Sequence, residues 1–197
     1  MKLVIATSNK GKLEEFKQML SDTPLEILSL LDFPGIKIVE NGNSFEENAV
    51  IKAVETAKKT GLPSLGDDSG LEVKFLGGKP GIFTARYAGE NATSDDNIKK
   101  LLSELEGVPF EEREAQFVCF LCFALPNGKY YIEKGNLKGF ITFEPVGKNG
   151  FGYDPVFYVP ELGKTLAEAD SETKNRISHR GRALEKIRRH ILCELVY

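Results

Sequence analysis

The apolar positions in the first half of the chain predict strands that alternate with helices. Residues 3–6 form a short apolar run that predicts a strand, and residues 25–30 predict a second one. A capping box followed by apolar residues on one stripe predicts a helix over residues 44–61, which ends at a glycine. Residues 71–76 then alternate between apolar and polar, as a half-buried strand does.

In the second half of the chain, strands follow one another directly. Residues 113–125 and 129–143 predict two long strands, joined by a tight turn at 126–128 that contains an Asn-Gly pair. A short helix is expected to begin at residues 93–94, and a closing helix is expected over 181–194. Alternation followed by a hairpin predicts an α/β fold with a mixed sheet flanked by helices.

Composition places the chain among ordinary soluble proteins. Its 197 residues suit one domain with two lobes, and 41% hydrophobic with 28% charged residues is typical of a globular protein. A net charge of -3 provides no overall field for a nucleic-acid backbone, so no nucleic-acid partner is expected. The longest apolar run, 117–125, is too short to span a membrane as a helix, and the N-terminus lacks a signal peptide's apolar region. We therefore expect a cytoplasmic protein with no membrane partner.

Three cysteines are too few for a disulfide framework. Cys119 and Cys122 have a C-x-x-C spacing, but they lie in the apolar run 117–125. An odd spacing in a strand places two side chains on opposite faces. The pair is therefore interpreted as two buried core residues and not as a metal or redox site.

The turn Thr7-Ser8-Asn9-Lys10-Gly11-Lys12 leads from the first strand into a helical pattern and is the first candidate site. Unpaired N–H groups in the first turn of a helix, together with its dipole, attract anions, and the two lysines add positive charge. The turn is not a Walker A loop, because Ala6 and Leu13 stand where that motif needs glycine and Ser or Thr. The pattern predicts a polyphosphate ligand.

The segment Gly66-Asp67-Asp68-Ser69-Gly70 is the second candidate site and is expected between two strand-like segments. These residue types are also common in ordinary turns. The alternative is that one carboxylate binds Mg²⁺ and accepts a proton from attacking water. Because neighbouring side chains of an extended segment point opposite ways, one aspartate is expected to be catalytic and the other structural.

Three further places carry polar or aromatic groups suited to a nucleotide. Phe151 to Asp154 follow a glycine-rich stretch and predict a flexible loop that presents an aromatic ring for stacking on a base and then a carboxylate. The run from Lys174 to Arg182 gathers cations, His179 and small polar residues before the closing helix. Glu40 ends a predicted strand before the capped helix and has no signal of its own.

Taken together, five segments resemble the inosine triphosphate pyrophosphatase family of non-canonical purine nucleotide hydrolases. The resemblance runs along the whole chain in order. The segments are Thr7 to Lys12, Ser44-Phe45-Glu46-Glu47-Asn48-Ala49, Asp67-Asp68-Ser69-Gly70-Leu71, Phe151-Gly152-Tyr153-Asp154 and Ser178-His179-Arg180.

The resemblance implies an elongated mixed sheet with two helical lobes around a central substrate cleft, in a homodimer. It implies Mg²⁺-dependent hydrolysis of ITP, dITP and XTP to the monophosphate and pyrophosphate. Asp68 would be the catalytic proton acceptor, with Glu40 and Asp68 as metal ligands. The residues that would bind the nucleotide substrate are Thr7, Ser8, Asn9, Lys10, Gly11, Lys12, Ser69, Phe151, Gly152, Tyr153, Asp154, Lys174, His179 and Arg180.

Two positions depart from the family pattern: Gly66 stands where relatives often have alanine, and Thr84 where serine is usual. Two other functions stay open at this point. One is a Mg²⁺-dependent pyrophosphatase for other modified nucleotides, such as modified pyrimidines. The other is a nucleotide-binding sensor without turnover, although a carboxylate pair beside a phosphate site gains little unless a cation intervenes.

Overall fold

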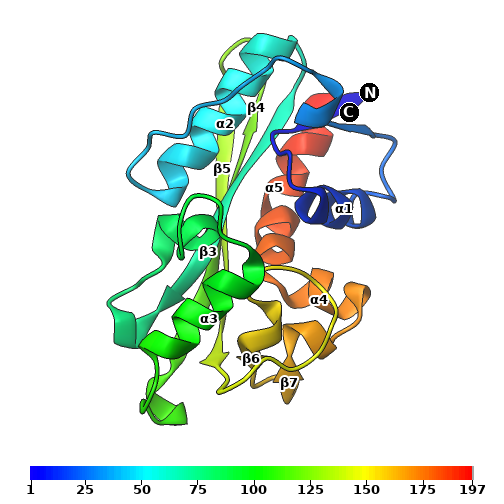
Figure 1. Ribbon diagram of the computed structural model, residues 1–197. Coiled ribbons are helices and arrows are strands. Elements are labelled where there is room, and N and C mark those ends of the chain that lie inside the picture. The colour runs from blue at the N-terminus through cyan, green and yellow to red at the C-terminus, as the bar shows by residue number, and fades with distance from the viewer. Residues whose placement is uncertain (197) are drawn as a thin grey trace. The chain divides into compact units, whose positions relative to one another are not determined.

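The computed structural model describes residues 1–196, which form a mixed α/β fold. Its strands are β1 (Lys2–Ile5), β2 (Glu26–Ser29), β3 (Ser64–Val73), β4 (Glu114–Ala124), β5 (Tyr130–Ile141), β6 (Phe157–Val159) and β7 (Lys164–Thr165). Its α-helices are α1 (Lys10–Met19), α2 (Phe45–Thr60), α3 (Ser94–Glu104), α4 (Ser171–Ile177) and α5 (His179–Leu195) (Figure 1).

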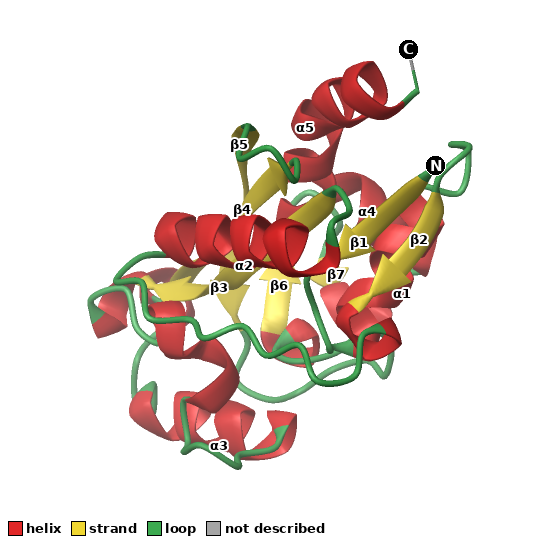
Figure 2. Ribbon diagram, turned by 90° about the horizontal axis from the view of Figure 1, so that it is seen from above, coloured by secondary structure: helices red, strands yellow, loops and turns green. Residues whose placement is uncertain are grey.

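The seven strands form one sheet in the order β2-β1-β3-β4-β5-β6-β7. In the first half of the chain, a helix connects each strand to the next, and the strands pair in parallel. Strand β1 lies between β2 and β3, and Figure 2 shows β1 and β2 side by side. The later pairs, β5 with β6 and β6 with β7, are antiparallel. The predicted mixed sheet flanked by helices is therefore confirmed.

The chain divides into two compact units. Unit 1 comprises residues 1–68, 119–135 and 179–197, and unit 2 comprises 69–118 and 136–178. The strands β3, β4 and β5 each contribute residues to both units.

Unit 1 packs helices on both faces of its strands. On one face, α1 and α5 cover a cluster that includes Leu3, Phe16, Cys119 and Ile187. On the other face, α2 packs through an alanine stripe against a cluster that includes Cys122. Figure 1 shows α2 on one side of the strands and α1 and α5 on the other. Cys119 and Cys122 lie in these two different clusters, which confirms their prediction as core residues on opposite faces.

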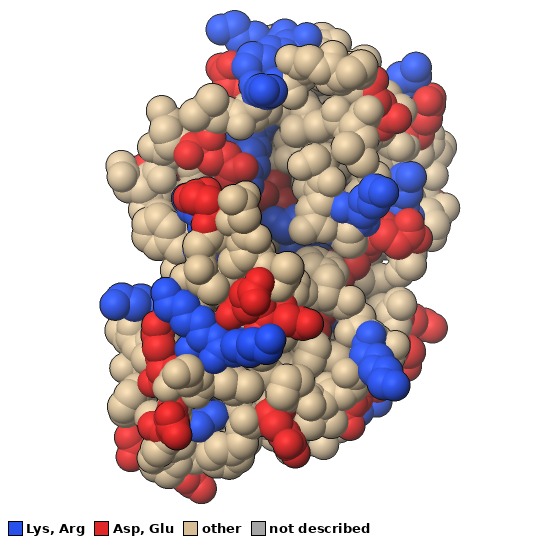
Figure 3. Space-filling model, in the orientation of Figure 1, with Lys and Arg blue, Asp and Glu red and all other residues tan. Residues whose placement is uncertain are grey.

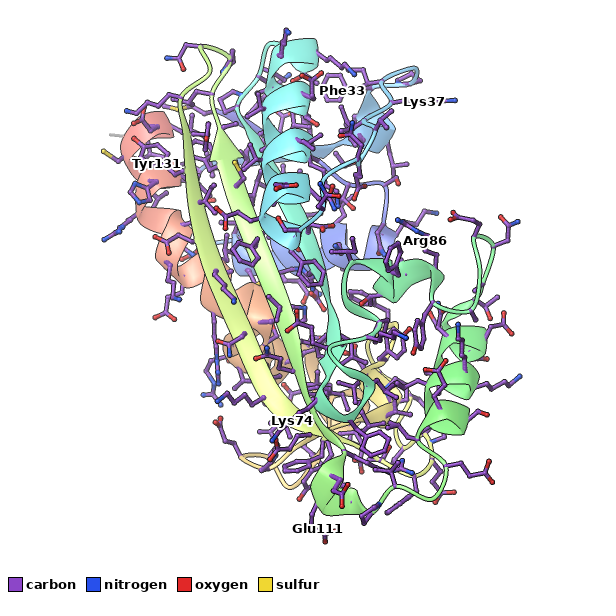
Figure 4. All side chains as sticks on the ribbon, turned by 90° about the vertical axis from the view of Figure 1, so that its left-hand side faces the viewer. Phe33, Lys37, Lys74, Arg86, Glu111 and Tyr131 are labelled. Carbon is purple, nitrogen blue, oxygen red and sulfur yellow. The ribbon has the colours of Figure 1, made fainter. Side chains whose placement is uncertain are left out.

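Within unit 1, strand β5 packs against helix α5. Tyr131 points toward α5 in Figure 4 and stacks on His190, with ring centroids 4.1 Å apart. Its hydroxyl donates to Glu194 at 2.6 Å. The turn before β5 is the predicted one, since Gly128 has a positive φ of 89° and its N–H donates to the carbonyl of Leu125.

Unit 2 has a core of its own. Leu71 and Val73 of β3 pack with Leu101 of α3, Phe117 of β4 and Phe157 of β6. Helix α3 begins as predicted, because Thr93 and Asp96 form a capping box. Residues 74–76 continue as a short 3-10 helix, so the strand predicted over 71–76 ends three residues earlier, at Val73.

Candidate functional site

Asp67 and Asp68 lie in the middle of a strand. The segment 66–70 belongs to β3, a continuous strand of ten residues, so the prediction that it lies between two strand-like segments is wrong. Asp and Gly are unfavourable in strands, which is why the pattern suggested a turn. The predicted opposite orientation is confirmed, because Asp67 contacts α1 and α5 whereas Asp68 contacts α2.

The Asp68 carboxylate is held by a buried lysine that also contacts Glu40. Lys52 of α2 lies 2.7 Å from Asp68 Oδ1 and 2.7 Å from Glu40 Oε2, and its Nζ donates to the Asp67 carbonyl at 2.9 Å. Asp68 is 9% exposed, while the side chain of Glu40 is 45% exposed. Glu40 lies in an irregular segment, so the strand predicted to end there is wrong. Two carboxylates that are 28 residues apart in the sequence thus meet at one ammonium group.

Burial and charge act against each other in this cluster. Burial raises the pKa of Asp68 above its usual value, and the ammonium of Lys52 offsets part of that rise. For Lys52, burial lowers the pKa, but Asp68 and Glu40 outweigh it, so the pKa stays above its usual value. Because its pKa is raised, the Asp68 carboxylate is a stronger proton acceptor than an ordinary aspartate.

Asp67 is the centre of a second, fully buried network. Its Oδ1 accepts a short hydrogen bond from Lys12, and its Oδ2 accepts one from Arg180 Nε at 2.6 Å. The other end of that guanidinium donates from Nη1 to Glu15 Oε2 at 2.5 Å. Burial alone would raise the pKa of Asp67, but Arg180 and Lys12 hold that pKa well below its usual value. Asp67 is therefore a charged structural carboxylate.

The turn before α1 is organised by its own side chains. Asn9 is the N-cap, and its Oδ1 accepts from the N–H groups of Gly11 and Lys12, while Thr7 Oγ1 accepts from the N–H of Asn9. The expectation that the first-turn N–H groups are unpaired is wrong for Gly11 and Lys12. Ser8 and Lys10 are exposed. The N–H groups of Gly11 and Lys12 are therefore already used by the N-cap side chain in this arrangement.

A hollow lies between two helices of unit 1. Figure 3 shows this hollow between α2 and α1, and both basic and acidic side chains are visible in it. Helices α1 and α2 carry Lys12 and Lys52, whose side chains keep 16% and 10% of their surface exposed. Each ammonium group is held by a carboxylate, and each side chain keeps part of its surface exposed to solvent. An anion can therefore approach both lysines.

Unit 2 contains a separate cluster around Asp154. Its carboxylate accepts from Lys174 Nζ at 2.6 Å and from the N–H of Phe151 at 2.8 Å, and the Lys174 ammonium lies 4.5 Å from the centroid of the Phe151 ring. Asp154 is 3% exposed, so the loop predicted to present its carboxylate is in fact closed around it. Gly150 has a φ of +76°, and a Cβ there would meet Asp154 Oδ2 at 2.1 Å, so this close approach requires glycine.

Of the two aromatic residues in this loop, Phe151 is half-buried and Tyr153 is buried. Tyr153 is 3% exposed, packs in the core of unit 2 and donates its hydroxyl to the carbonyl of Thr84 at 3.0 Å. Tyr153 therefore does not face solvent, and stacking of Phe151 on a base stays a prediction. Gly152 and Ser69 are half-buried.

The basic run from Lys174 to Arg182 is not a loop. Residues up to Ile177 belong to α4, which the sequence analysis missed, and α5 begins at His179, two residues before the predicted start. His179 and Arg180 are buried, at 6% and 2% exposed. Both lie in the first turn of α5 and face the interior, and their predicted contact with the substrate stays a prediction.

The donor set fits a divalent cation with few protein ligands. Among the residues that the structure describes, no group of three or more His, Cys, Asp or Glu side chains could hold a metal ion. Asp68 and Glu40, however, present carboxylate oxygens to the same small volume around Lys52. Mg²⁺ is commonly bound by one or two carboxylates together with water and substrate phosphates. These two residues would hold it.

Lys52 and Glu15 are the functional candidates that the sequence analysis missed. Each is a charged residue beside an apolar position that faces the core, Lys52 before Ala53 and Glu15 before Phe16. A charge on the buried side of an amphipathic helix requires a partner, because a lone buried charge is costly. A charged residue beside a core-facing apolar position was therefore the sequence signal that could have identified Lys52 and Glu15.

Within residues 1–196, no helix combines the length and apolarity needed to cross a membrane.

The fold and this site define an α/β protein in which strand β3 carries two carboxylates, each paired with a lysine. A model of the Ham1 family matches residues 3–190, and the chain belongs to that family. A dITP/XTP pyrophosphatase of Geobacter sulfurreducens is 53% identical over 191 residues, which cover 96% of each chain. A dITP/XTP pyrophosphatase of Bacillus licheniformis is 50% identical over 94% of this chain and 95% of its own.

Solved structures agree. A HAM1 protein from Coxiella burnetii is 44% identical, with a TM-score of 0.87, and the match covers 98% of this chain and 99% of that chain. A structure from Mycobacterium abscessus titled nucleoside-triphosphatase / dITP/XTP pyrophosphatase is 41% identical, with a TM-score of 0.74, over 95% and 97% of the two chains. The family resemblance stated from the sequence is confirmed.

Proposed function

We propose that this protein is a Mg²⁺-dependent nucleoside triphosphate pyrophosphatase that hydrolyses the non-canonical purine nucleotides ITP, dITP and XTP to the monophosphate and pyrophosphate. The observation that carries the proposal is the cluster of Asp68, Lys52 and Glu40, together with Lys12, which the neighbouring Asp67 holds. The names of the relatives, dITP/XTP pyrophosphatases at about half identity over nearly the full length, support the reaction and the substrate class.

The residues of this cluster divide the work between binding and proton transfer. Lys12 and Lys52 provide fixed positive charge for the phosphate chain, and Lys10 is an exposed cation beside them. Asp68 accepts the proton of the attacking water, for which its raised pKa suits it. A bound Mg²⁺ would neutralise phosphate charge and polarise the phosphoryl oxygens. Attack at the α-phosphorus then releases pyrophosphate, whose developing charge the lysines stabilise.

Selectivity for the base follows from donors and acceptors. Hypoxanthine and xanthine carry a carbonyl at position 6, whereas adenine carries an amino group, so a donor directed at that position rejects ATP. Guanine must be excluded at position 2, where a second donor would oppose its amino group. Leaving a buried polar group unpaired costs about 1 to 3 kcal/mol, which gives useful discrimination at each position. Lys174, His179, Arg180 or a backbone N–H would supply the donor at position 6, and Phe151 would stack on the base.

A panel of nucleoside triphosphates, assayed for pyrophosphate release with and without Mg²⁺, tests the proposal. We expect release from ITP, dITP and XTP, little from ATP and GTP, and none without a divalent cation. Preference for a modified pyrimidine triphosphate would instead indicate a pyrophosphatase for modified pyrimidine nucleotides. Nucleotide binding without any release would identify a sensor.

The homodimer is a separate prediction, which light scattering of the purified protein tests directly.

A further inference from the structure

Within unit 2, one threonine ties the 3-10 helix Gly81–Arg86 to strand β3. The hydroxyl of Thr84 accepts a hydrogen bond from the N–H of Leu71, a β3 residue, at 2.8 Å. The same hydroxyl donates to the carbonyl of Gly81 at 2.6 Å. A hydroxyl can do both at once because it is donor and acceptor. The contact therefore joins the strand to the start of the 3-10 helix.

The main-chain carbonyl of Thr84 holds a second part of unit 2. It accepts the hydroxyl of Tyr153 at 3.0 Å, and Tyr153 is buried in the core of this unit. In the same loop, the Asp154 carboxylate accepts from the N–H of Phe151 at 2.8 Å and from Lys174 Nζ at 2.6 Å. Thr84 thus contacts β3 through its side chain and the loop of residues 151–154 through its main chain.

Helix α3 fixes the other end of the same 3-10 helix. The side chain of Asn97 is buried, and its Oδ1 accepts from the N–H of Ala88 at 2.7 Å while its Nδ2 donates to the carbonyl of Ala85 at 3.1 Å. The carbonyl of Thr84 therefore lies between two anchored points, the Thr84 hydroxyl on β3 and the Asn97 amide on α3. An acceptor fixed in this way gives Tyr153 one defined position.

We propose that Thr84 is a positioning residue for the nucleotide site: it fixes the loop of residues 151–154 relative to Ser69 and thereby places the Phe151 ring for the base. The inference rests on the proposed function, because it concerns the base end of the same substrate. Ser69 lies two residues before Leu71 on β3, so the Thr84 hydroxyl acts next to it along the strand. Thr84 itself contacts no substrate in this role and acts through Tyr153.

The two bonds of the hydroxyl distinguish this role from simple support of the 3-10 helix. A threonine that only stabilised its own turn would need the contact with Gly81 and not the one with Leu71. Without the hydroxyl, the 3-10 helix is released from β3, and the carbonyl that holds Tyr153 moves with it. A binding group that must be ordered when the ligand arrives binds more weakly than one that is already in place.

The matched variants are Thr84→Val, Thr84→Ser and Thr142→Val. Valine has the shape of threonine without its hydroxyl, whereas serine, the usual residue of the family at position 84, keeps the hydroxyl. Thr142 is the control because it is also half-buried in unit 2 and its hydroxyl also donates to a main-chain carbonyl, that of Glu144, at 2.7 Å.

Amide hydrogen exchange, followed by NMR without any nucleotide, is the first readout. We expect Thr84→Val to accelerate exchange at Leu71 and, at least tenfold, at Phe151. Thr84→Ser and Thr142→Val should exchange at both amides as the wild type does. Acceleration at Leu71 without Phe151 would reveal local support only and would overturn the proposal. Acceleration at Phe151 no larger than at Leu121, a buried residue of unit 1, would overturn it too, because it would reflect general destabilisation.

Ligand affinity is the second readout, measured by calorimetry with Mg²⁺. The probes are inosine monophosphate, which has the base, and inorganic pyrophosphate, which lacks it. We expect Thr84→Val to weaken binding of the monophosphate roughly tenfold, as is usual when a residue that orients a direct ligand is removed, and Thr84→Ser to restore it. Pyrophosphate affinity should stay within twofold of the wild-type value. Equal losses for both probes, or no loss for either, contradict the proposal.

The two readouts separate this proposal from the proposed function. If the protein is no purine nucleotide hydrolase, the wild type fails to bind inosine monophosphate, while the exchange experiment still reports whether Thr84 holds the Phe151 loop. If Thr84→Val does not fold, Tyr153→Phe removes the same link from the loop side. It should accelerate exchange at Phe151 and leave Leu71 unchanged; an unchanged Phe151 amide in that variant overturns the proposal.

Discussion

Asp67 and Asp68 are consecutive residues of β3, yet their carboxylates hold lysines from helices on opposite faces of the sheet. Asp67 pairs with Lys12 of α1, and Asp68 pairs with Lys52 of α2. The pleat of a strand sends neighbouring side chains to opposite faces, so one dipeptide can fix two cations from two helices. This arrangement gives the two aspartates different surroundings: Asp67 is 2% exposed and Asp68 is 9% exposed, and the proposed function makes Asp68 the proton acceptor.

Removing Lys52 should shift the pH dependence of the reaction. The pKa of Asp68 is already raised by burial, and the Lys52 ammonium is the main opposing influence. In Lys52→Met the pKa of Asp68 rises further, so activity is lost at a higher pH as the solution is acidified. The measurement is the acid limb of kcat/KM against pH for ITP. Lys58→Met, at an exposed position of the same helix, is the control, and an acid limb that coincides in all three proteins would contradict the account.

Asp67→Asn should destabilise the fold. The change leaves Arg180 and Lys12 without a counterion in a buried place, and breaking a buried pair costs about 3–5 kcal/mol. Because the pKa of Asp67 is lowered in the folded protein, its contribution is present above the pKa of the unfolded chain and is lost as pH falls through the folded value. Denaturant unfolding at several pH values measures this. A variant as stable as the wild type at neutral pH would refute the structural role.

Gly66→Ala should disturb the contact between α2 and β3. A Cβ at Gly66 would lie 2.4 Å from the carbonyl oxygen of Ala49 and 2.7 Å from the nitrogen of Ala53, both backbone atoms of α2. The helix must therefore move away and carry Lys52 with it. Overpacking of this kind costs roughly 1–3 kcal/mol, and we expect kcat to fall together with stability. Thermal unfolding and turnover of ITP check both effects; unchanged values in both would show that α2 has room to shift.

Hydrolysis in ¹⁸O-labelled water locates the bond that is broken. Attack at the α-phosphorus places the label in the monophosphate, because the water oxygen joins the phosphorus that it attacks. Mass spectrometry of the two products reads the result. Label in pyrophosphate would place the attack at the β-phosphorus and would require a different position for the phosphate chain beside Lys12.

Much of the fold was predictable because local patterns set it. The alanine stripe of α2, the Thr93 cap of α3 and the Asn127-Gly128 turn all act over a few residues, and the structure has each of them. The predicted capping box of α2 forms only in part, since Ser44 accepts from the N–H of Glu47 whereas the Glu47 carboxylate accepts from the N–H of Asn43.

The site was less predictable because its contacts join distant parts of the chain. Arg180 and Asp67 are 113 residues apart in the sequence, so no local sequence motif predicts their ion pair. The same pair, together with Lys12, explains why Gly66 to Gly70 lie within a strand against the preference of these residue types, since buried charge pairing holds Asp67 there. Glu40 was found through the family resemblance alone, and the structure shows that Lys52 brings its carboxylate close to that of Asp68.

The most direct test of the central claim is Asp68→Asn, which keeps the shape of the side chain but removes the proton acceptor. Single-turnover hydrolysis of ITP should slow by roughly 10²- to 10⁴-fold, the usual contribution of a general base. ITP affinity, measured by calorimetry with Ca²⁺ in place of Mg²⁺, should stay within a few-fold of the wild-type value, because Lys12 and Lys52 remain. Turnover at the wild-type rate in a folded Asp68→Asn protein would contradict the account.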